Sequence, residues 1–253
     1  MSSLQILSLN RKLEKSLEKF GDSIVTAGLF LAPHNRSGHN VCPNAGFCSA
    51  VCNLWFSGRT VTGNVRDAMI RRTKLYFDNP AEFFDVVHDD IAKLRRVAVR
   101  EGKQLYLRMN GSSDLDFSRW AIEFPDVQFY DYTKRPEFIE RKLAGNWPLN
   151  YWLCYSFNEH ADPALCDRYL ALGGTVSVVF DTEYCPQHDR IGKLPKRFTF
   201  PGSVRRWRVV DGDQHDLRHP QFDGTGVVVG LRFKGSRRLM ETAIDRGFVV
   251  RTK

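Results

Sequence analysis

The chain has 253 residues, of which 42% are hydrophobic, so it can bury the core of one large domain or two small ones. Its formal net charge of +8 at pH 7 favours an anionic partner, such as nucleic acid, a phosphorylated cofactor or an acidic protein. No apolar run reaches the roughly 18 residues that a membrane-spanning helix needs, and the N-terminus lacks a signal-peptide pattern. The sequence therefore predicts a cytoplasmic protein without membrane contact, folded as a single domain over residues 1–253.

The first elements are predicted from the spacing of apolar residues. Leucines at helical spacing over 8–20 predict a helix within the N-terminal segment 1–22. The apolar run Ile24–Leu31 predicts a strand, and the polar segment 33–59 that follows it predicts a long loop.

Two basic helices are predicted next, over 64–77 and 81–100, because apolar residues recur at a period of 3.6 in both segments. Their polar faces are rich in lysine and arginine and form the candidate surface for nucleic acid. An ordinary charged face in contact with solvent is the alternative. The basic residues are Arg66, Arg71, Arg72, Lys74, Lys93, Arg95, Arg96 and Arg100.

From Gln104 onward, strand-like and helix-like segments alternate. Alternation of this kind predicts right-handed crossovers and a parallel sheet that is covered on both faces. We expect an α/β fold: a TIM-like closed or partly open βα barrel with parallel strands and an N-terminal helical segment. The predicted strands are 104–109, 127–132, 150–156, 175–180, 207–210 and 226–231, and the predicted helices end near 122 or span 136–143 and 163–172.

The most distinctive feature is a group of three cysteines, Cys42, Cys48 and Cys52, with the spacing C-x5-C-x3-C. Neighbouring thiolates repel one another unless a cation or a covalent bond neutralises them. The surrounding glycine, asparagine and proline residues let the backbone fold tightly around a compact group and donate N–H groups to it. We therefore predict that the three thiols hold an iron–sulfur cluster, most simply a 4Fe-4S cluster.

Two alternatives stay open at this point. Zinc prefers four ligands, supplied as pairs two to four residues apart, a pattern that the five-residue gap fits poorly, and the cysteines could be ordinary buried thiols. A disulfide framework is typical of small secreted chains, whereas this chain is long enough to bury a full core. Three thiolates leave one iron of a four-iron cluster open for S-adenosylmethionine, another small molecule or a further side chain. The further candidates are Cys154, Cys166, Cys185, His34 and His39.

Polar residues follow each predicted strand, and in a parallel barrel the carboxyl ends of the strands meet at one rim, where sites are built. Those after the second strand, Arg108, Asn110, Ser113 and Asp114, are predicted to bind a cofactor. Arg108, Asp114, Lys134 and Glu159 are the catalytic candidates, to position a ligand or move protons. Turn formation is the alternative role for each of them. The other residues assigned to the rim are Asp131, Tyr132, Ser156, Asn158, Asp181, Glu183, Asp211, Asp213, His215 and Asp216.

Several well-known catalytic patterns are missing. The sequence contains no nucleophile elbow, no phosphate-binding loop and no dinucleotide-binding glycine fingerprint. The run Asp211–Asp216 alternates carboxylates as a calcium loop does but lacks the downstream glutamate. We interpret this run as a hydrogen-bonded segment of the rim that orders Arg218.

Six motifs, in the same order along the chain, resemble the phage-encoded "gene product eighty-eight" family. The resemblance implies a phage or prophage protein. It also implies that Cys42, Cys48 and Cys52 form the family's three-cysteine motif. The placement of this motif is similar to that of the cluster loop of radical S-adenosylmethionine enzymes. The cysteine spacing in those enzymes is C-x3-C-x2-C. The motifs are His39–Pro43 with Cys48 and Cys52, Ser57–Arg59, Arg108–Asp114, Phe129–Lys134, Val210–Arg218 and Val229–Gly235.

Two classes of function follow from the sequence. In the first, the chain is a cluster protein with redox or radical-S-adenosylmethionine-like activity on a small-molecule ligand, in the host cytoplasm. In the second, it is a non-catalytic iron–sulfur or zinc-stabilised module that binds nucleic acid or a host protein through its basic helices. The sequence leaves open whether the protein is an enzyme.

Overall fold

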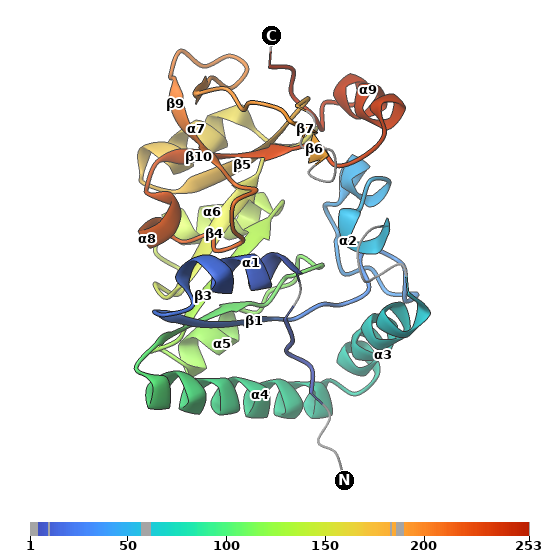
Figure 1. Ribbon diagram of the computed structural model, residues 1–253, viewed down its shortest axis with the longest axis vertical. Helices are drawn as coiled ribbons and strands as arrows, with labels where there is room; N and C mark the ends of the chain where they lie inside the picture. Colours follow the sequence, from blue (N-terminus) through green and yellow to red (C-terminus); the bar gives the residue numbers. More distant parts are fainter. Residues whose placement is uncertain (1–4, 10, 57–61, 183, 186–189, 253) are drawn as a thin grey trace. The chain divides into compact units, whose positions relative to one another are not determined.

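The fold is a mixed α/β arrangement with a mostly parallel sheet (Figure 1). A computed structural model describes residues 5–9, 11–56, 62–182, 184–185 and 190–252. Within these residues the strands of the main sheet are hydrogen-bonded in the order β1-β2-β3-β4-β5-β10-β9-β8, and β6 pairs with β7 in a separate ribbon. The strands are β1 (Ile24–Gly28), β2 (Gln104–Arg108), β3 (Gln128–Thr133), β4 (Tyr151–Ser156), β5 (Thr175–Phe180), β6 (Tyr184–Cys185), β7 (Arg190–Ile191), β8 (Arg197–Phe198), β9 (Trp207–Asp211) and β10 (Val227–Arg232).

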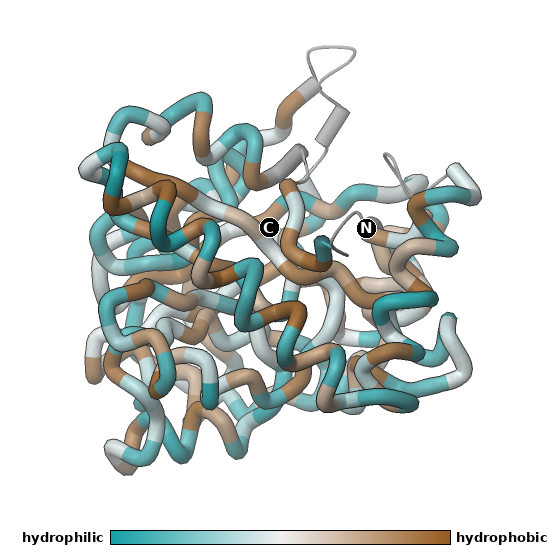
Figure 2. The backbone as a smooth tube through the Cα atoms, turned by 90° about the horizontal axis from the view of Figure 1, so that it is seen from below, coloured by the Kyte–Doolittle hydropathy of each residue, from teal (hydrophilic) through white to brown (hydrophobic). Residues whose placement is uncertain are grey.

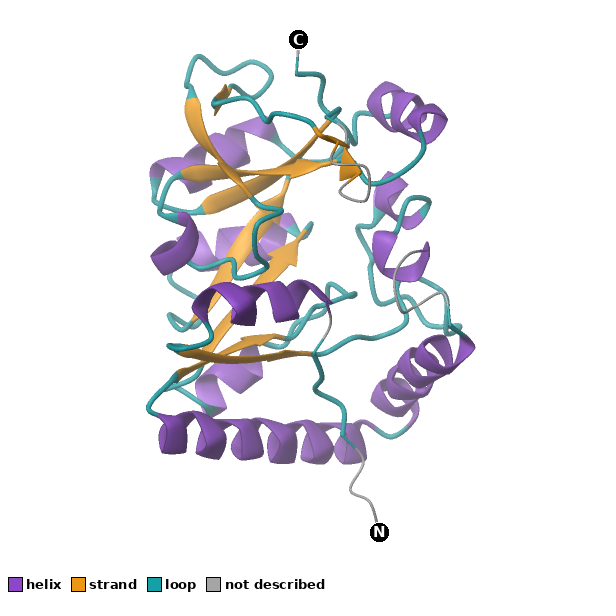
Figure 3. Cartoon of the chain, in the orientation of Figure 1, coloured by secondary structure: helices purple, strands orange, loops and turns teal. Residues whose placement is uncertain are grey.

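Helices connect most of these strands, and the drawing by secondary structure makes the alternation visible (Figure 3). They are α1 (Arg11–Phe20), α2 (Asn53–Phe56), α3 (Gly63–Asp78), α4 (Pro80–Glu101), α5 (Ser118–Glu123), α6 (Pro136–Leu143), α7 (Pro163–Ala171), α8 (Pro220–Asp223) and α9 (Arg237–Asp245), with a short 3-10 helix at Gly46–Ser49. Brown, hydrophobic stretches alternate with teal, hydrophilic ones along the chain (Figure 2). This is the pattern that half-buried helices and strands require.

The chain divides into two compact units. The first comprises residues 1–43, 52–131 and 148–152, and the second comprises 44–51, 132–147 and 153–253. The single domain over residues 1–253 stays a prediction.

In the first unit, α4 covers the parallel strands β1 and β2, which pair from Ile24 opposite Gln104 to Gly28 opposite Arg108. Its residues Phe83, Val87 and Ile91 recur every four positions and are buried, as expected of a helix that packs on a sheet. The helix starts where the Asn79 side chain accepts a hydrogen bond from the backbone of Glu82, with Pro80 in its first turn. It ends at Gly102, whose φ of 64° lies in the left-handed region that glycine tolerates.

In the second unit, β10 is the central strand, because it pairs in parallel with both β5 and β9. Its apolar run Val227–Val229 is buried, together with Val176 and Val178 of β5. A continuous apolar run of this kind is typical of parallel strands that are covered on both faces. Asp162 caps the start of helix α7, because its carboxylate accepts a hydrogen bond from the backbone of Ala164.

The predicted α/β class with mainly parallel strands is confirmed, but closure into a barrel is not shown. The strand order has two ends, β1 and β8, and β8 pairs with β9 in the antiparallel sense. The two-residue strands β6, β7 and β8 were not predicted, because two residues carry no periodicity.

The N-terminal helix begins at Arg11, later than predicted, because the backbone of Ser8 exchanges two hydrogen bonds of 2.9 Å with Gly28. The first strand ends at Gly28, before the predicted Leu31. Among the helices of the described residues, none is long and apolar enough to cross a bilayer. Cytoplasmic localisation stays a prediction.

Candidate functional site

Cys42 lies beside the polar loop that follows β2, within the first unit. Its Sγ accepts a hydrogen bond from the backbone N–H of His34 (3.4 Å) and donates one to the carbonyl of Ser112 (3.5 Å). The adjacent Val41 carbonyl accepts a hydrogen bond from the backbone N–H of Asp114 (2.8 Å). The structure therefore brings the first predicted ligand together with the loop that was predicted to bind a cofactor.

The backbone at His34 is unusual, since its φ of 51° lies in the left-handed region that residues other than glycine rarely adopt. This is the conformation in which its N–H meets Cys42 Sγ. Left-handed residues of this kind persist where the surrounding structure holds them, often at functional sites. The other candidate histidine, His39, instead stacks on Phe77, with ring centroids 4.2 Å apart.

The loop after β2 is buried and organised around Asn110. Its Oδ1 accepts hydrogen bonds from Ser113 Oγ and from the backbone N–H of Leu115, both 2.8 Å. Its backbone N–H and Nδ2 donate to the carboxylate of Asp131, at 2.7 and 3.0 Å. Asn110 and Ser113 thus use these polar atoms to build the loop, and Arg108 and Asp114 are buried beside them.

Asp131, near the carboxyl end of β3, is a buried carboxyl group with a raised pKa. Burial raises the pKa of Asp131 to about 7, although hydrogen bonds from Tyr151 and Asn110 and the charge of Arg108 lower it. A carboxyl group with a pKa near 7 exchanges its proton at physiological pH, as a general acid or base must. The sequence placed Asp131 at the rim but did not single it out, because its burial is a tertiary property.

Cys48 lies in the second unit, in the 3-10 helix Gly46–Ser49, where it is half-buried against an apolar cluster. That cluster contains Val51, Phe233, Ala243, Phe248 and Val249.

Two catalytic candidates contact this same segment. The Glu159 carboxylate accepts a hydrogen bond from the backbone N–H of Phe47, and the Lys134 carbonyl accepts one from Asn44 Nδ2 (3.2 Å). A Cβ at Gly46 would collide with Glu159, so this close approach requires glycine. Lys134 acts here through its backbone, whereas Glu159 acts through its side chain.

Cys52 precedes α2 in the first unit and is also half-buried. Its carbonyl accepts hydrogen bonds from the backbone N–H groups of Trp55 (3.0 Å) and Phe56 (3.1 Å), so it forms the start of that short helix.

Two of the remaining cysteines are more deeply buried than Cys42, Cys48 and Cys52. Cys154 and Cys166 are buried, and burial raises the pKa of Cys154 to about 12 and that of Cys166 still further. Because the thiolate is the metal ligand, groups that stay protonated at neutral pH are poor ligands. The side chain of Cys185 lies outside the described residues, as do Glu183 and the motif at 57–59.

The types of side chain in the cysteine segment favour metal binding, whereas the positions of the described side chains do not form a metal site. Three thiols in eleven residues suit a soft ion such as zinc or the iron of a cluster. However, within the part of the chain that the structure describes, no three His, Cys, Asp or Glu side chains are arranged to hold a metal ion. The chemistry of the segment fits a metal, whereas the described side chains do not form a preformed ligand set.

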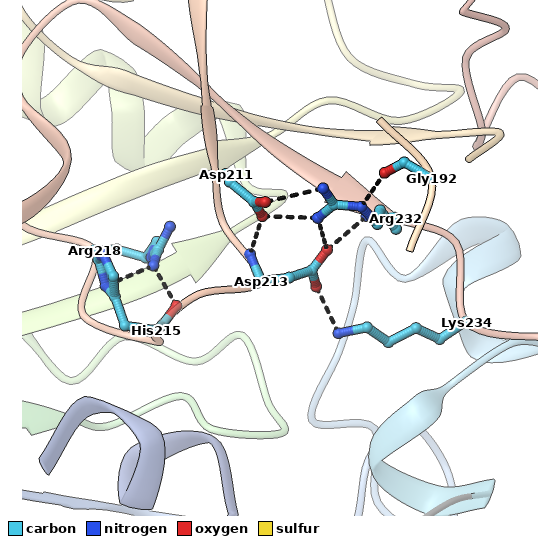
Figure 4. Close-up of polar contacts among 7 residues, drawn as sticks. All are labelled: Gly192, Asp211, Asp213, His215, Arg218, Arg232 and Lys234. Atoms are coloured by element: carbon cyan, nitrogen blue, oxygen red, sulfur yellow. Dashed lines mark hydrogen bonds and ion pairs between the residues drawn. The ribbon is translucent and has the colours of Figure 1, made fainter. Parts of the chain in front are cut away.

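A second polar cluster lies at the carboxyl ends of β9 and β10 in the second unit (Figure 4). Arg232 donates to both carboxylate oxygens of Asp211 (2.8 and 2.9 Å) and to Asp213 (3.1 Å), and its Nε donates to the Gly192 carbonyl (2.7 Å). Lys234 contacts the other oxygen of Asp213 at 2.7 Å. The two carboxylates hold two cations in one network, so the charges compensate one another.

Arg218 is fully buried (0% exposed), and its guanidinium group lies against His215 (Figure 4). It donates to the His215 carbonyl, to His215 Nδ1 (3.0 Å) and to the Asp216 carbonyl (3.4 Å), and it pairs with Asp223 at 3.2 Å. Burial lowers the pKa of Arg218, but nearby Tyr132, Asp223 and Asp216 raise it above its usual value. The segment after Asp211 thus orders Arg218, as interpreted from the sequence.

The other rim residues lie in structural contacts. Ser156 accepts a hydrogen bond from Ser177 (3.2 Å), and Asp181 accepts two hydrogen bonds of 2.8 Å from Thr252. Asn158 is buried, and its Oδ1 accepts a hydrogen bond from the backbone of His160 (2.8 Å).

Three of the basic residues of α4 lie close to carboxylates. Arg95 pairs with Asp126 (2.6 Å), Lys93 approaches Asp90 (3.9 Å) and Arg100 approaches Glu101 (3.8 Å). A carboxylate close to a cation reduces the local positive potential. Nucleic-acid binding by α3 and α4 stays a prediction.

The family model for gene product 88 matches residues 5–252, which is nearly the whole chain. The chain belongs to the gene product 88 family. This is the phage gene-product family that the sequence motifs resemble. Comparison with curated proteins gave no match. Comparison with solved structures likewise gave none.

Two of the motifs of this gene product 88 chain meet in space, a contact that the sequence did not reveal. The motif at 210–218 provides Asp211 and Asp213, and the motif at 229–235 provides Arg232 and Lys234. Neither cation was among the predicted site residues. The available signal was complementary charge in two separate motifs, but pairing them needs the adjacency of β9 and β10.

The pH dependence of stability tests the environment of Asp131. Between about pH 4 and pH 7 the native carboxyl keeps the proton that the unfolded chain has lost, so this group should lower the free energy of unfolding by about 1.4 kcal/mol per pH unit as pH rises. Asp131→Asn should remove this contribution from the slope. Urea denaturation of both proteins across this range measures it, and equal slopes would refute the assignment.

Replacing Arg232 tests the charge network in the second unit. Its side chain is 6% exposed and that of Asp213 is 4% exposed, so Arg232→Met leaves a buried carboxylate with one partner fewer. The free energy of unfolding should fall by about 3 kcal/mol.

The matched control is Arg251→Met, which breaks the exposed ion pair with Glu241. It should lower the free energy of unfolding by less than about 1 kcal/mol. Chemical denaturation measures both losses. Similar losses in the two variants would show that burial does not strengthen the network.

Proposed function

We propose that this protein binds an iron–sulfur cluster through Cys42, Cys48 and Cys52. The observation that carries the proposal is that these three thiols fall within eleven residues and are half-buried. Buried Cys154 and Cys166 lack that combination of clustering and access. Ligand thiols need some access, so that they can lose a proton and meet the metal.

The polar surroundings of the segment support the proposal. The backbone N–H of His34 already donates to Cys42 Sγ, which is the type of contact that stabilises a thiolate ligand and tunes a cluster. Near Cys48, the Glu159 carboxylate fixes the backbone at Phe47. These residues would orient the ligands and hold the segment in place.

The metal itself would complete the ligand set. Metal sites commonly form as the metal binds, since thiolates repel one another in its absence. A bound cluster would supply electron transfer or, at an iron without a protein thiolate, a position for a ligand. S-adenosylmethionine as that ligand, and the roles of Arg108, Asp114 and Lys134 toward it, stay predictions.

The direct test is anaerobic reconstitution of the full chain with iron and sulfide, followed by analysis of iron, acid-labile sulfide and zinc per chain. We expect iron and sulfide in equal amounts in the wild type, and loss of most of both in Cys48→Ala, because a cluster with two remaining thiolates is poorly held.

The matched control is Ser49→Ala, which changes the next residue of the same 3-10 helix and should keep the wild-type iron content. Zinc in place of iron would favour the zinc-stabilised module. A wild-type chain that binds neither metal would refute the proposal.

A further inference from the structure

A cavity of about 660 Å³ lies in the first unit and is lined by residues on either side of the cysteine segment 42–52 in the sequence. Its volume is in the range of sites for small organic molecules. Its walls come from the N-terminal segment, α1, β1, α3 and α4. The lining residues that define its chemistry are Leu7, Leu17, Ile24, Arg72, Leu94 and Val97.

The N-terminal wall of the cavity is fixed by the fold. The buried carboxylate of Asp90 accepts hydrogen bonds from the backbone N–H groups of Ile6 (2.7 Å) and Leu7 (3.0 Å). The next residue, Ser8, pairs with Gly28. A wall held by four backbone hydrogen bonds keeps its position without a ligand, so the cavity is preformed.

One cation of the cavity lining makes no close ion pair. Lys103 Nζ contacts Glu101 at 3.0 Å, so these two lining residues pair with each other. Arg72 has no carboxylate within 4 Å in the residues that the structure describes. Burial and the neighbouring Arg71 lower the pKa of Arg72, and Asp90 opposes this only in part, so the charge of Arg72 is destabilised where it lies.

One polar group of the wall also lacks a partner. Thr26 is 4% exposed, and its Oγ1 makes no hydrogen bond to any described residue. An unsatisfied buried hydroxyl is unfavourable. Rotation about its Cα–Cβ bond, between staggered positions, would offer this hydroxyl to a ligand oxygen.

We propose that this cavity binds a small amphipathic carboxylate, with its hydrocarbon chain against the leucine, isoleucine and valine wall and its anionic group at Arg72. A monoanion matches the one lining cation that has no carboxylate within 4 Å among the described residues, and an apolar chain matches the leucine, isoleucine and valine residues of the lining. The proposal is independent of the iron–sulfur cluster.

The test is calorimetric titration of the full chain with decanoate, with decanol as the uncharged probe of the same chain length. Decanoate should bind more tightly than decanol. Arg72→Gln should weaken decanoate binding by about tenfold or more, because it removes a charge-assisted hydrogen bond, and should leave decanol binding nearly unchanged.

A second pair of variants tests the location. Val97→Asp places a carboxylate in the cavity wall and should abolish decanoate binding. Val99→Asp changes the same helix at a residue that is 71% exposed and should bind as the wild type does. Thermal unfolding checks that each variant is folded. The proposal is wrong if decanoate does not bind the wild type, or if it binds the Val97 and Val99 variants equally.

Discussion

Parallel pairing of strands is the constraint on which the arrangement of polar residues depends. In the first unit, β1 and β2 run in parallel, so the loops that follow them emerge at the same edge. This places Cys42 beside Ser112 and Val41 beside Asp114. In the second unit the parallel pair β9 and β10 places Asp211 next to Arg232 in the same way.

The strand pairing buries ionisable side chains, and each of them needs hydrogen bonds or an opposite charge to offset the loss of water. Asp131 lies where burial favours its neutral form, and three hydrogen-bond donors converge on its carboxyl group. Arg218 keeps its charge because Asp223 and the groups of the 215–216 segment surround it. Both arrangements satisfy the rule that buried charges are paired or shift their pKa. They also explain why polar residues collect after the strands without each of them being catalytic.

Much of the fold could be predicted from the sequence. Helix α6 and strand β5 have the predicted boundaries, since each carries a clear period and a proline or glycine nearby. The sequence predicted a closed or partly open barrel without deciding between them, because periodicity identifies strands but not whether the first and last of them pair. The N-terminal helix was predicted too long, since the bridge between Ser8 and Gly28 is a tertiary contact.

The site could be predicted only in part. Spacing identified the three cysteines, and the rule for strand ends identified the loop at 110–114 that lies beside Cys42. Spacing could not reveal that Asn110 donates hydrogen bonds to Asp131, or that Arg232 and Lys234 pair with Asp213. Partners that are distant in the sequence are brought together by packing. The raised pKa of Asp131 likewise depends on burial, which no single residue type encodes.

The account depends most on whether the three neighbouring thiols bind inorganic iron. Mössbauer spectroscopy on the full chain, reconstituted without oxygen with isotopically enriched iron, measures this directly. The account predicts the signal of tetrahedral, sulfur-ligated iron in a cluster, lost when Cys42, Cys48 and Cys52 are all replaced by alanine. A spectrum of unbound iron only, or the same cluster signal in the triple variant, would contradict it.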